Sequence, residues 1–166
     1  KTIDNDVGAT ESSIGFDTAV QVATQALDNL HSTAVSHSRS MILEVMGRDA
    51  GHIALSSGIA GGADIILMPE IKYSIKGIIN KLNQMKKKNL KHSLVVVAEA
   101  VKKENGNKVI HEFKDGQKRL GGIGEYIANE IMSKTDIECR VTALGHVQRG
   151  APPTHNDRIL ASAFGV

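Results

Sequence analysis

The chain has 166 residues, and its 20 Lys and Arg against 18 Asp and Glu give a net charge of +2. This near balance argues against binding to nucleic acid or to a lipid surface through bulk charge. Aromatic residues make up 3% of the chain and Trp is absent, so a base-stacking surface has little material. The apolar fraction of 41% is typical of a globular domain with a core of its own, which excludes a disordered chain.

The cysteine content and the hydropathy of the chain indicate the compartment in which the protein works. The single cysteine, Cys139, excludes a disulfide framework and a metal site built from several cysteines, and it fits a reducing environment. The longest purely apolar run, residues 94–98, is far too short to cross a bilayer. We therefore expect a cytoplasmic protein with no membrane and no nucleic-acid partner. Because the chain lacks an initiator Met and stops within an expected helix, we also expect it to be a piece of a longer protein.

The pattern of apolar residues predicts helices and strands in alternation. A stripe at i, i+3, i+4 and i+7 predicts a first helix over residues 14–31. The elements expected after it are a strand at 41–46, a helix at 50–60, a strand at 65–68, a helix at 75–85, a buried central strand at 94–97, a helix at 123–131, a strand at 140–144 and a helix at 155–164. Residues 101–120 are charged and irregular, and we expect a surface excursion there with a hairpin turn at Asn105-Gly106. The alternation predicts an α/β fold, in which a mostly parallel sheet carries helices on both faces in a three-layer, Rossmann-like arrangement.

Ligands bind such sheets beyond the carboxyl ends of the strands, so site residues are expected at those ends. The chain opens as if partway through a further strand, and in extended backbone Asp4 and Asp6 would point to the same side. Two close carboxylates can divide their work, one as a general base and one near a metal ion. The alternative is an ordinary turn, which Asp and Asn favour.

Two further strand ends carry residues that suit a sugar phosphate. After the strand at 41–46, Gly47 allows the backbone to approach a ligand closely and Arg48 suits a phosphate. The alternative there is an ordinary strand-to-helix turn with a surface arginine. Glu99 directly follows the strand at 94–97, where it could hold a sugar hydroxyl. The alternative is a carboxylate that interacts with a helix dipole or lies solvated on the surface.

The last strand is followed by a basic segment rich in glycine. His146 and Arg149 stand three residues apart and could grip an anionic group together, the alternative being a loop histidine and a solvated arginine. The run Gly121-Gly122-Ile123-Gly124 opens a helix but lacks the G-x-G-x-x-G spacing, so we expect it to be structural. Carboxylates together with His and Arg at strand ends are typical of a phosphoryl-transfer or phosphosugar site.

Five short runs of this sequence and the single residue Glu99 occur together in a distinctive order. They are Thr2-Ile3-Asp4-Asn5-Asp6, Met46-Gly47-Arg48, Gly61-Gly62, Glu99, LGHVQRG at 144–150 and DRILA at 157–161. In this order they resemble the 6-phosphofructokinase family. The resemblance implies an enzyme of glycolysis that transfers a phosphoryl group from ATP or pyrophosphate to the 1-hydroxyl of fructose 6-phosphate, giving fructose 1,6-bisphosphate. It also implies Mg²⁺ as the cofactor.

The resemblance implies roles for single residues at the reacting centre. Asp4 would take the proton of the sugar 1-hydroxyl as general base, with Thr2 beside the reacting atoms. Asp6 would lie near the magnesium ion and the transferred phosphoryl group, and Arg48 would neutralise charge in the transition state. Lys1 bears on donor specificity, because a lysine also occurs there in pyrophosphate-dependent members of the family, although ATP-dependent members can carry it too.

The resemblance also implies which residues bind the sugar phosphate. They are Met46, Gly47 and Glu99 for the sugar, and His146, Arg149, Arg39 and Arg140 for its 6-phosphate. Arg39 precedes Met46 by roughly 23 Å of extended strand, and Arg140 precedes His146 by roughly 20 Å. Because neither arginine can easily reach the site of its own chain, we expect a homo-oligomer, a dimer or tetramer, whose subunits share active sites.

The sequence departs from the family pattern in two respects. The glycine-rich loop that binds the phosphoryl donor is absent. We therefore expect residues 1–166 to be the fructose 6-phosphate-binding and catalytic domain, without the upstream donor domain and inactive alone. His31 and Leu90 replace basic residues of an effector site, so we expect no allosteric control of that type. The alternatives are a non-catalytic phosphosugar-binding module or inactive paralogue, and an unrelated α/β nucleotide-binding or structural domain.

Overall fold

The computed structural model describes residues 3–112 and 118–165 of the chain. Its main sheet has four strands, all parallel, in the order β2-β3-β1-β6. Their bounds are Ser40–Val45 for β1, Ile65–Leu67 for β2, Ser93–Ala98 for β3 and Cys139–Ala143 for β6. β1 and β3 lie in the middle of the sheet and are buried along their whole length. The predicted parallel sheet, with a central strand near residues 94–97, is confirmed.

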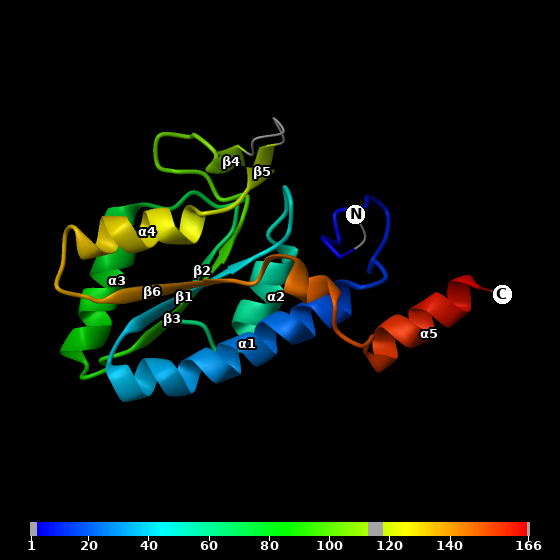
Figure 1. Cartoon of the computed structure of the whole chain (residues 1–166), viewed down its shortest axis with the longest axis horizontal. Helices are drawn as coiled ribbons and strands as arrows, with labels where there is room; N and C mark the ends of the chain where they lie inside the picture. Colours follow the sequence, from blue (N-terminus) through cyan, green and yellow to red (C-terminus); the bar gives the residue numbers. More distant parts are fainter. Residues whose placement is uncertain (1–2, 113–117, 166) are drawn as a thin grey trace.

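Helices cover both faces of this sheet (Figure 1). Helices α1 and α2 pack together against one face, and α3 and α4 lie on the other. Their bounds are Phe16–His37 for α1, His52–Ala60 for α2, Ile75–Lys87 for α3 and Ile123–Met132 for α4. The predicted three-layer α/β architecture is therefore confirmed. Within residues 3–112 and 118–165, no helix has the length and apolar character that crossing a bilayer would require.

The strand register brings the carboxyl ends of β1, β3 and β6 together, at what we call the carboxyl edge of the sheet. Ser40, at the start of β1, pairs with Ser93 of β3 on one side and with Cys139 of β6 on the other. Because parallel strands advance by about 3.3 Å per residue, strands that start together also end together. The segments that follow β1, β3 and β6 therefore leave the sheet side by side, and residues from all three can meet there.

Helix α1 is longer than the sequence predicted, since it ends at His37 rather than near residue 31. Ala34 is fully buried against Met41 and Leu94, so the inward-facing stripe continues for one more turn. Most other residues between 31 and 37 are exposed and polar, which hides this extension from hydrophobic periodicity. Ser38 adopts a left-handed conformation with φ of 52°, and the helix ends there.

Residues 101–120 fit the predicted surface excursion only in part. The turn at Asn105-Gly106 is confirmed, because Lys102 and Lys108 form an antiparallel bridge and Gly106 has φ of 84°. The prediction of irregular backbone is wrong further along. There β4 (Ile110–Glu112) pairs with β5 (Lys118–Leu120) in a two-stranded antiparallel sheet.

Helix α5, His155–Phe164, projects from the body of the molecule (Figure 1). Its buried residue is Asp157, whose carboxylate accepts hydrogen bonds from the backbone N–H groups of Gly15, at 2.8 Å, and Thr18, at 2.9 Å. The hydroxyl of Thr18 donates to the same carboxylate. Because the first N–H groups of a helix lack partners within the helix, Asp157 both satisfies the start of α1 and anchors α5 to it.

Candidate active site at the carboxyl edge of the sheet

The turn that follows β1 requires a glycine. A Cβ atom on Gly47 would lie 2.3 Å from the carbonyl oxygen of Ala50, which is far inside van der Waals contact. Arg48 comes next with φ of 51°, and 55% of its side chain is exposed. The group that requires a glycine here is the protein's own backbone, and close approach of this turn to a ligand stays a prediction. The turn presents Arg48 to solvent at the carboxyl edge of the sheet.

Glu99, the first residue after β3, holds this turn in place. Its Oε1 atom accepts hydrogen bonds from the backbone N–H of Arg48 at 2.9 Å and of Gly47 at 3.3 Å. Burial raises the pKa of Glu99, the two N–H donors oppose that shift, and the carboxylates of Asp4 and Glu44 add to it. The alternative of a solvated surface carboxylate is therefore wrong, because Glu99 is half-buried and structurally engaged.

The N-terminal segment is a turn, which confirms the stated alternative, and the expectation that Asp4 and Asp6 share the face of an extended strand is wrong. Residues 3–5 form a turn, in which Asn5 adopts a left-handed φ of 53°. The side-chain oxygen of Asn5 accepts a hydrogen bond from the N–H of Ser13 at 2.8 Å and closes a loop. Asn tolerates the left-handed region and bonds to nearby backbone, and this turn chemistry outweighs the period-two pattern.

Asp4 is 3% exposed, and its Oδ1 atom finds no hydrogen-bond donor among the residues that the structure describes. Burial raises the pKa of Asp4, and the nearby carboxylate of Asp6 raises it further. The guanidinium groups of Arg149 and Arg48 act in the opposite direction. All these groups are therefore close enough to Asp4 to change its protonation, although Asp6 itself is exposed. Lys1 and Thr2 lie outside the described residues.

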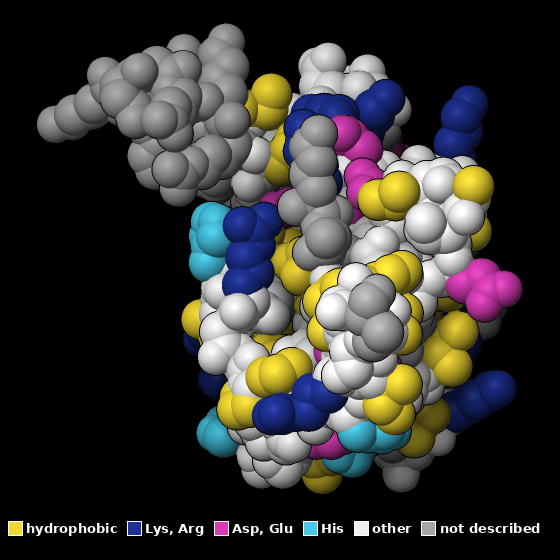
Figure 2. Space-filling view, turned by 90° about the vertical axis from the view of Figure 1, so that its right-hand side faces the viewer, with side chains coloured by type: hydrophobic (Ala, Val, Ile, Leu, Met, Phe, Trp, Pro, Cys, Tyr) yellow, Lys and Arg dark blue, Asp and Glu magenta, His cyan; other side chains and the backbone are white. Residues whose placement is uncertain are grey.

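His146 and Arg149 lie on a short 3₁₀ helix, η1, which spans Gly145–Arg149. A 3₁₀ helix has three residues per turn, so side chains three apart lie on the same face. Both side chains are exposed, and Arg149 is near enough to lower the pKa of Asp4. Four segments of the chain thus bring Asp4, Arg48, Glu99 and Arg149 to one site. Figure 2 looks onto this edge of the molecule, where basic and acidic side chains gather side by side in the upper part.

Two buried polar residues at this edge were not predicted from the sequence. Gln148 is 1% exposed, and its Oε1 atom accepts a hydrogen bond from the backbone N–H of Met46 at 2.8 Å. Glu44, inside β1, accepts from the N–H groups of Gly122 at 2.9 Å and Gly124 at 2.8 Å, where α4 begins. A carboxylate within the otherwise apolar run 41–46 was a signal for Glu44. No comparable signal marked Gln148. The structural role expected for the glycines at 121–124 is supported.

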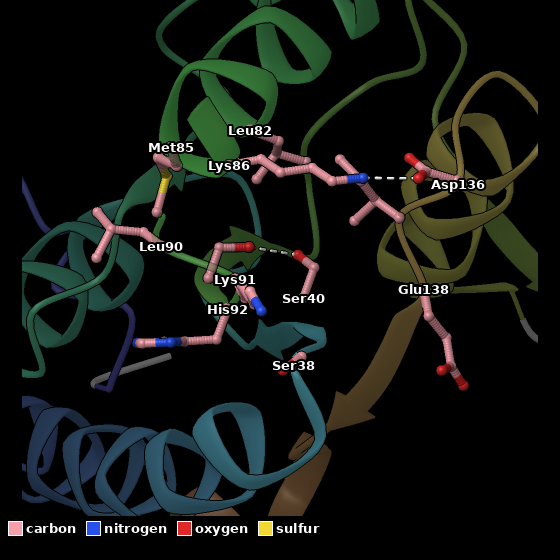
Figure 3. A pocket seen from close by; sticks show the side chains of 12 residues that line it. Ser38, Ser40, Leu82, Met85, Lys86, Leu90, Lys91, His92, Asp136 and Glu138 are labelled. Atoms are coloured by element: carbon pink, nitrogen blue, oxygen red, sulfur yellow. Dashed lines mark hydrogen bonds and ion pairs between the residues drawn. The ribbon is translucent and has the colours of Figure 1, made fainter. Parts of the chain in front are cut away.

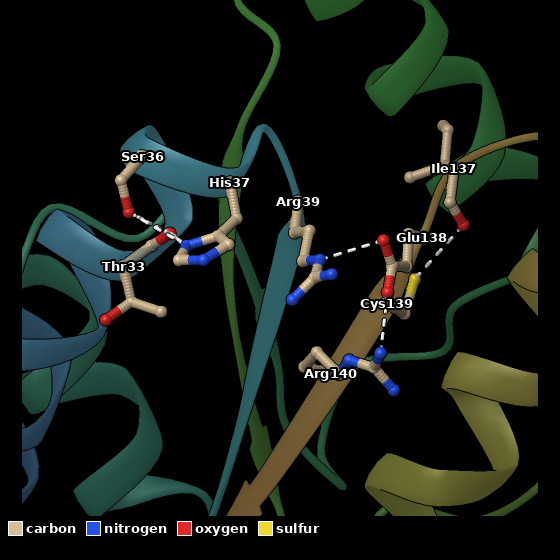
Figure 4. Close-up of polar contacts among 8 residues, drawn as sticks. All are labelled: Thr33, Ser36, His37, Arg39, Ile137, Glu138, Cys139 and Arg140. Atoms are coloured by element: carbon tan, nitrogen blue, oxygen red, sulfur yellow. Dashed lines mark hydrogen bonds and ion pairs between the residues drawn. The ribbon is translucent and has the colours of Figure 1, made fainter.

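Arg39 and Arg140 lie at the opposite edge of the sheet (Figure 4). Arg39 precedes β1, and Arg140 is the second residue of β6. Glu138 binds both, at 2.8 Å from Nε of Arg39 and 2.7 Å from an Nη of Arg140. The strand lengths had predicted this location, so the two arginines do not join Asp4 and Arg149 within one chain.

A pocket of about 490 Å³ opens at that opposite edge, between the end of α3 and the start of β6 (Figure 3). Leu90 and His92 line it, and the ring of His31 packs edge-on against His92 with 5.5 Å between ring centroids. Of the two positions that the sequence had linked to effector binding, His31 thus packs on His92, and Leu90 lines the same pocket as His92. Neither His31 nor Leu90 carries a permanent positive charge.

The described residues contain no group of three or more His, Cys, Asp or Glu side chains arranged to hold a metal ion. Mg²⁺ at phosphate sites keeps several waters and binds through one or two carboxylates together with phosphate oxygens. Asp6, exposed beside the buried and unpartnered oxygen of Asp4, can supply such a carboxylate. Asp4 and Asp6 thus offer oxygen ligands of the kind that a magnesium–phosphate complex takes.

The fold and this site define an α/β domain whose polar centre lies at the carboxyl ends of parallel strands. Comparison with models of protein families assigns it more narrowly, because the model named Phosphofructokinase matches residues 1–166. The chain belongs to the phosphofructokinase family.

The chain is similar both to proteins named as ATP-dependent and to proteins named as pyrophosphate-dependent. It is 60% identical to ATP-dependent 6-phosphofructokinase 1 of Synechocystis sp., over the whole chain and 46% of that protein. It is 50% identical to the pyrophosphate–fructose 6-phosphate 1-phosphotransferase of Amycolatopsis mediterranei, over the whole chain and 49% of that protein. The chain thus spans about half the length of these relatives.

Solved structures show the same fold. Phosphofructokinase from Saccharomyces cerevisiae matches 97% of this chain with a TM-score of 0.83 and 32% identity, over 20% of its own length. Pyrophosphate-dependent phosphofructokinase from Nitrosospira multiformis matches 99% with a TM-score of 0.83 and 26% identity, over 41% of its length.

Proposed function

We propose that the protein containing this chain transfers a phosphoryl group from ATP or pyrophosphate to O1 of fructose 6-phosphate, giving fructose 1,6-bisphosphate. The observation that carries the proposal is the convergence of Asp4, Arg48, Glu99 and Arg149 from four separate segments of a phosphofructokinase-family chain. An unrelated α/β domain would have no reason to place these four side chains together. The family's role in sugar phosphorylation gives each of them a task.

Asp4 acts as the general base in this proposal. As O1 attacks phosphorus, the hydroxyl proton passes to the Asp4 carboxylate, a P–O1 bond forms, and the bond from phosphorus to the donor oxygen breaks. Burial supports this role, because it raises the pKa of Asp4 and makes its carboxylate a better proton acceptor. Arg48 and Arg149 keep the ionised form accessible before the proton arrives.

Magnesium supplies charge neutralisation on the donor phosphates when it is bound. Asp6 is the residue that we assign to it, since its carboxylate is exposed at the rim of the site next to Asp4. Arg48 would add a second positive charge, because its exposed guanidinium can bind phosphoryl oxygens. Thr2 is assigned to the same centre by the family resemblance.

The sugar phosphate is held by the turn after β1, by Glu99 and by η1. Met46 and Gly47 begin the turn beside the sugar, and Glu99, which holds the N–H of Gly47, supplies a carboxylate for sugar hydroxyls. His146 and Arg149 form the 6-phosphate grip, since they share the exposed face of η1. Both groups bind a phosphate that does not react, and their contribution is mainly to substrate affinity.

Several features of the complete protein belong to this proposal as well. Residues 1–166 would be the fructose 6-phosphate-binding and catalytic domain, and a donor-binding segment elsewhere in the protein would complete the site. This chain alone would then be inactive. The protein would work in the cytoplasm as a homo-oligomer, with Arg39 and Arg140 of one subunit completing the phosphate grip of the next. Lys1 is assigned to donor choice.

The test is a product assay on the complete gene product. Fructose 6-phosphate and Mg²⁺ are supplied with ATP or with pyrophosphate, and formation of fructose 1,6-bisphosphate is followed with an aldolase-coupled assay. Product with one donor supports the proposal and identifies that donor. Binding of fructose 6-phosphate without turnover by either donor favours the non-catalytic phosphosugar-binding module, and neither binding nor turnover contradicts both.

A further inference from the structure

Three successive backbone amides of the turn after β1 are all held by side chains from neighbouring strand ends. The N–H of Met46 donates to Gln148, at 2.8 Å. The N–H groups of Gly47 and Arg48 both donate to Glu99, at 3.3 and 2.9 Å. The turn therefore has no freedom to set its own position. Its location is dictated by the loop after β3 on one side and by η1 on the other.

Gln148 differs from its neighbours on η1 in the direction of its side chain. His146 and Arg149 are exposed, whereas Gln148 is 1% exposed and is directed into the protein. On a 3₁₀ helix, positions 146 and 149 share a face and position 148 lies on a different one. A rigid connection thus runs from the exposed phosphate grip, through the backbone of η1 and the Gln148 side chain, to the amide of Met46.

The amide of Gln148 is the chemical group that this connection needs. Its Oε1 accepts from Met46, and its Nε2 lies 3.5 Å from the carbonyl oxygen of Ala19 in α1. A buried side chain that must accept from an N–H and donate to a carbonyl is matched by an amide and by no aliphatic side chain. If the amide were removed, the Met46 N–H would be left buried without a partner, and the turn would shift to recover one.

We propose that Gln148 is a positioning residue that sets the distance between the sugar-binding turn at Met46–Arg48 and the phosphate grip at His146 and Arg149. The inference rests on the proposed function, since it assigns the two ends of fructose 6-phosphate to these two segments. Gln148 itself touches no substrate. It acts by holding the turn at Met46–Arg48 and the phosphate grip at a fixed distance from each other. That distance matches the separation between the furanose ring and the 6-phosphate.

The experiment compares Gln148→Met with Gln148→Glu in the complete gene product. Methionine keeps the length of the side chain and loses both hydrogen bonds, whereas glutamate keeps an acceptor for the Met46 N–H. We expect Gln148→Met to raise KM for fructose 6-phosphate about tenfold, because the turn shifts relative to the phosphate grip, with KM for the donor unchanged. Gln148→Glu should stay closer to the unmodified protein. The matched control is Gln84→Met, at an exposed position on α3.

A second measurement separates positioning from general loss of structure. Sedoheptulose 7-phosphate, in its furanose form, has one carbon more between ring and phosphate than fructose 6-phosphate. In Gln148→Met its kcat/KM should rise relative to that of fructose 6-phosphate, because the distance between the turn and the phosphate grip is no longer fixed. Destabilisation alone would lower activity with both sugars equally and leave their kcat/KM ratio unchanged. An unchanged ratio together with an unchanged KM for fructose 6-phosphate overturns the inference.

Hydrogen exchange keeps the inference distinguishable from the proposed function. The peptide that contains Met46 should exchange faster in Gln148→Met than in the unmodified protein, whichever substrate the protein uses. If the unmodified protein shows no activity on fructose 6-phosphate, the proposed function fails while this exchange result still reports on the contact. If the unmodified protein is active and exchange at Met46 is unchanged by Gln148→Met, the inference fails and the proposed function stands.

Discussion

Replacing Asp4 by Asn should abolish most of the turnover of the complete protein and at the same time make it more stable. Removal of a general base costs about 10²–10⁴-fold in kcat, which corresponds to about 3–5 kcal/mol of barrier. The stability effect follows from the raised pKa of buried Asp4. As pH rises above 3.8, the unfolded state releases this proton first, so ionised Asp4 destabilises the fold at neutral pH. A neutral amide of the same size removes that penalty.

The assay pairs steady-state kinetics with thermal unfolding of the same preparations. Asp4→Asn should keep its KM for fructose 6-phosphate, lose kcat and gain in Tm at pH 7, whereas at pH 3 the gain in Tm should shrink. Asp28→Asn, at an exposed position on α1, is the control for removal of one negative charge. A kcat within tenfold of the unmodified protein refutes the general-base role. A large drop in Tm refutes the electrostatic reasoning even if activity is lost.

Three other consequences can be checked with the same material. Arg149→Ala or His146→Ala should raise KM for fructose 6-phosphate about tenfold or more with kcat within a few fold, and the reverse pattern would contradict the phosphate grip. Asp157→Ala removes three hydrogen bonds at the start of α1 and should lower the free energy of unfolding by about 2–4 kcal/mol in urea titrations. With His31 and Leu90 at the opposite edge, velocity against fructose 6-phosphate should be hyperbolic, and a sigmoidal curve relieved by ADP would contradict this.

The α/β layers could be predicted because each element carries its own local pattern. The stripe of Ile75, Ile78, Leu82 and Met85 is buried along α3, as its helical spacing required. The unbroken apolar run of β3 is typical of a strand covered on both faces, and β3 lies between β2 and β1. Parallel pairing then placed Arg39 and Arg140 at the far edge without any knowledge of side-chain contacts.

The N-terminal segment was mispredicted because two local rules compete there. The alternation of Asp4 and Asp6 fits a strand, whereas Asn5 favours a left-handed turn, and the turn prevails through the bond from Ser13 to Asn5. No paired strand competes for these residues in the described part of the chain, so local chemistry decides. The carboxylate of Asp6 is still close enough to raise the pKa of Asp4.

The inward-facing polar residues could not be predicted in full because their partners come from distant segments. Gln148 bonds to an amide 102 positions earlier, and Glu44 to amides about 80 positions later. Nothing in a local window distinguishes a buried glutamine on a 3₁₀ turn from a solvated one. Such residues emerge only when the neighbouring strand ends are placed side by side.

The location of Arg39 and Arg140 leads to the last prediction, that active sites are shared between subunits. Both side chains are held by Glu138 at the edge opposite Asp4 (Figure 4). The strand between Arg39 and Met46 separates them from the site of their own chain by roughly 23 Å, beyond the reach of an arginine side chain. If they bind the 6-phosphate at all, they must do so in a neighbouring subunit related by symmetry.

Subunit complementation tests this directly. Arg140→Ala and His146→Ala proteins, each of low activity alone at limiting fructose 6-phosphate, are mixed in equal amounts and allowed to exchange subunits. In a dimer with shared sites, half of the molecules are mixed, and each mixed dimer holds one site with both changes and one intact site, so about a quarter of full activity should return. Arg149→Ala mixed with His146→Ala is the control, because both residues belong to the same chain's grip and no intact site can form. Recovery in the first mixture and none in the second requires sharing across the interface, whereas no recovery after exchange is verified by mass spectrometry excludes it.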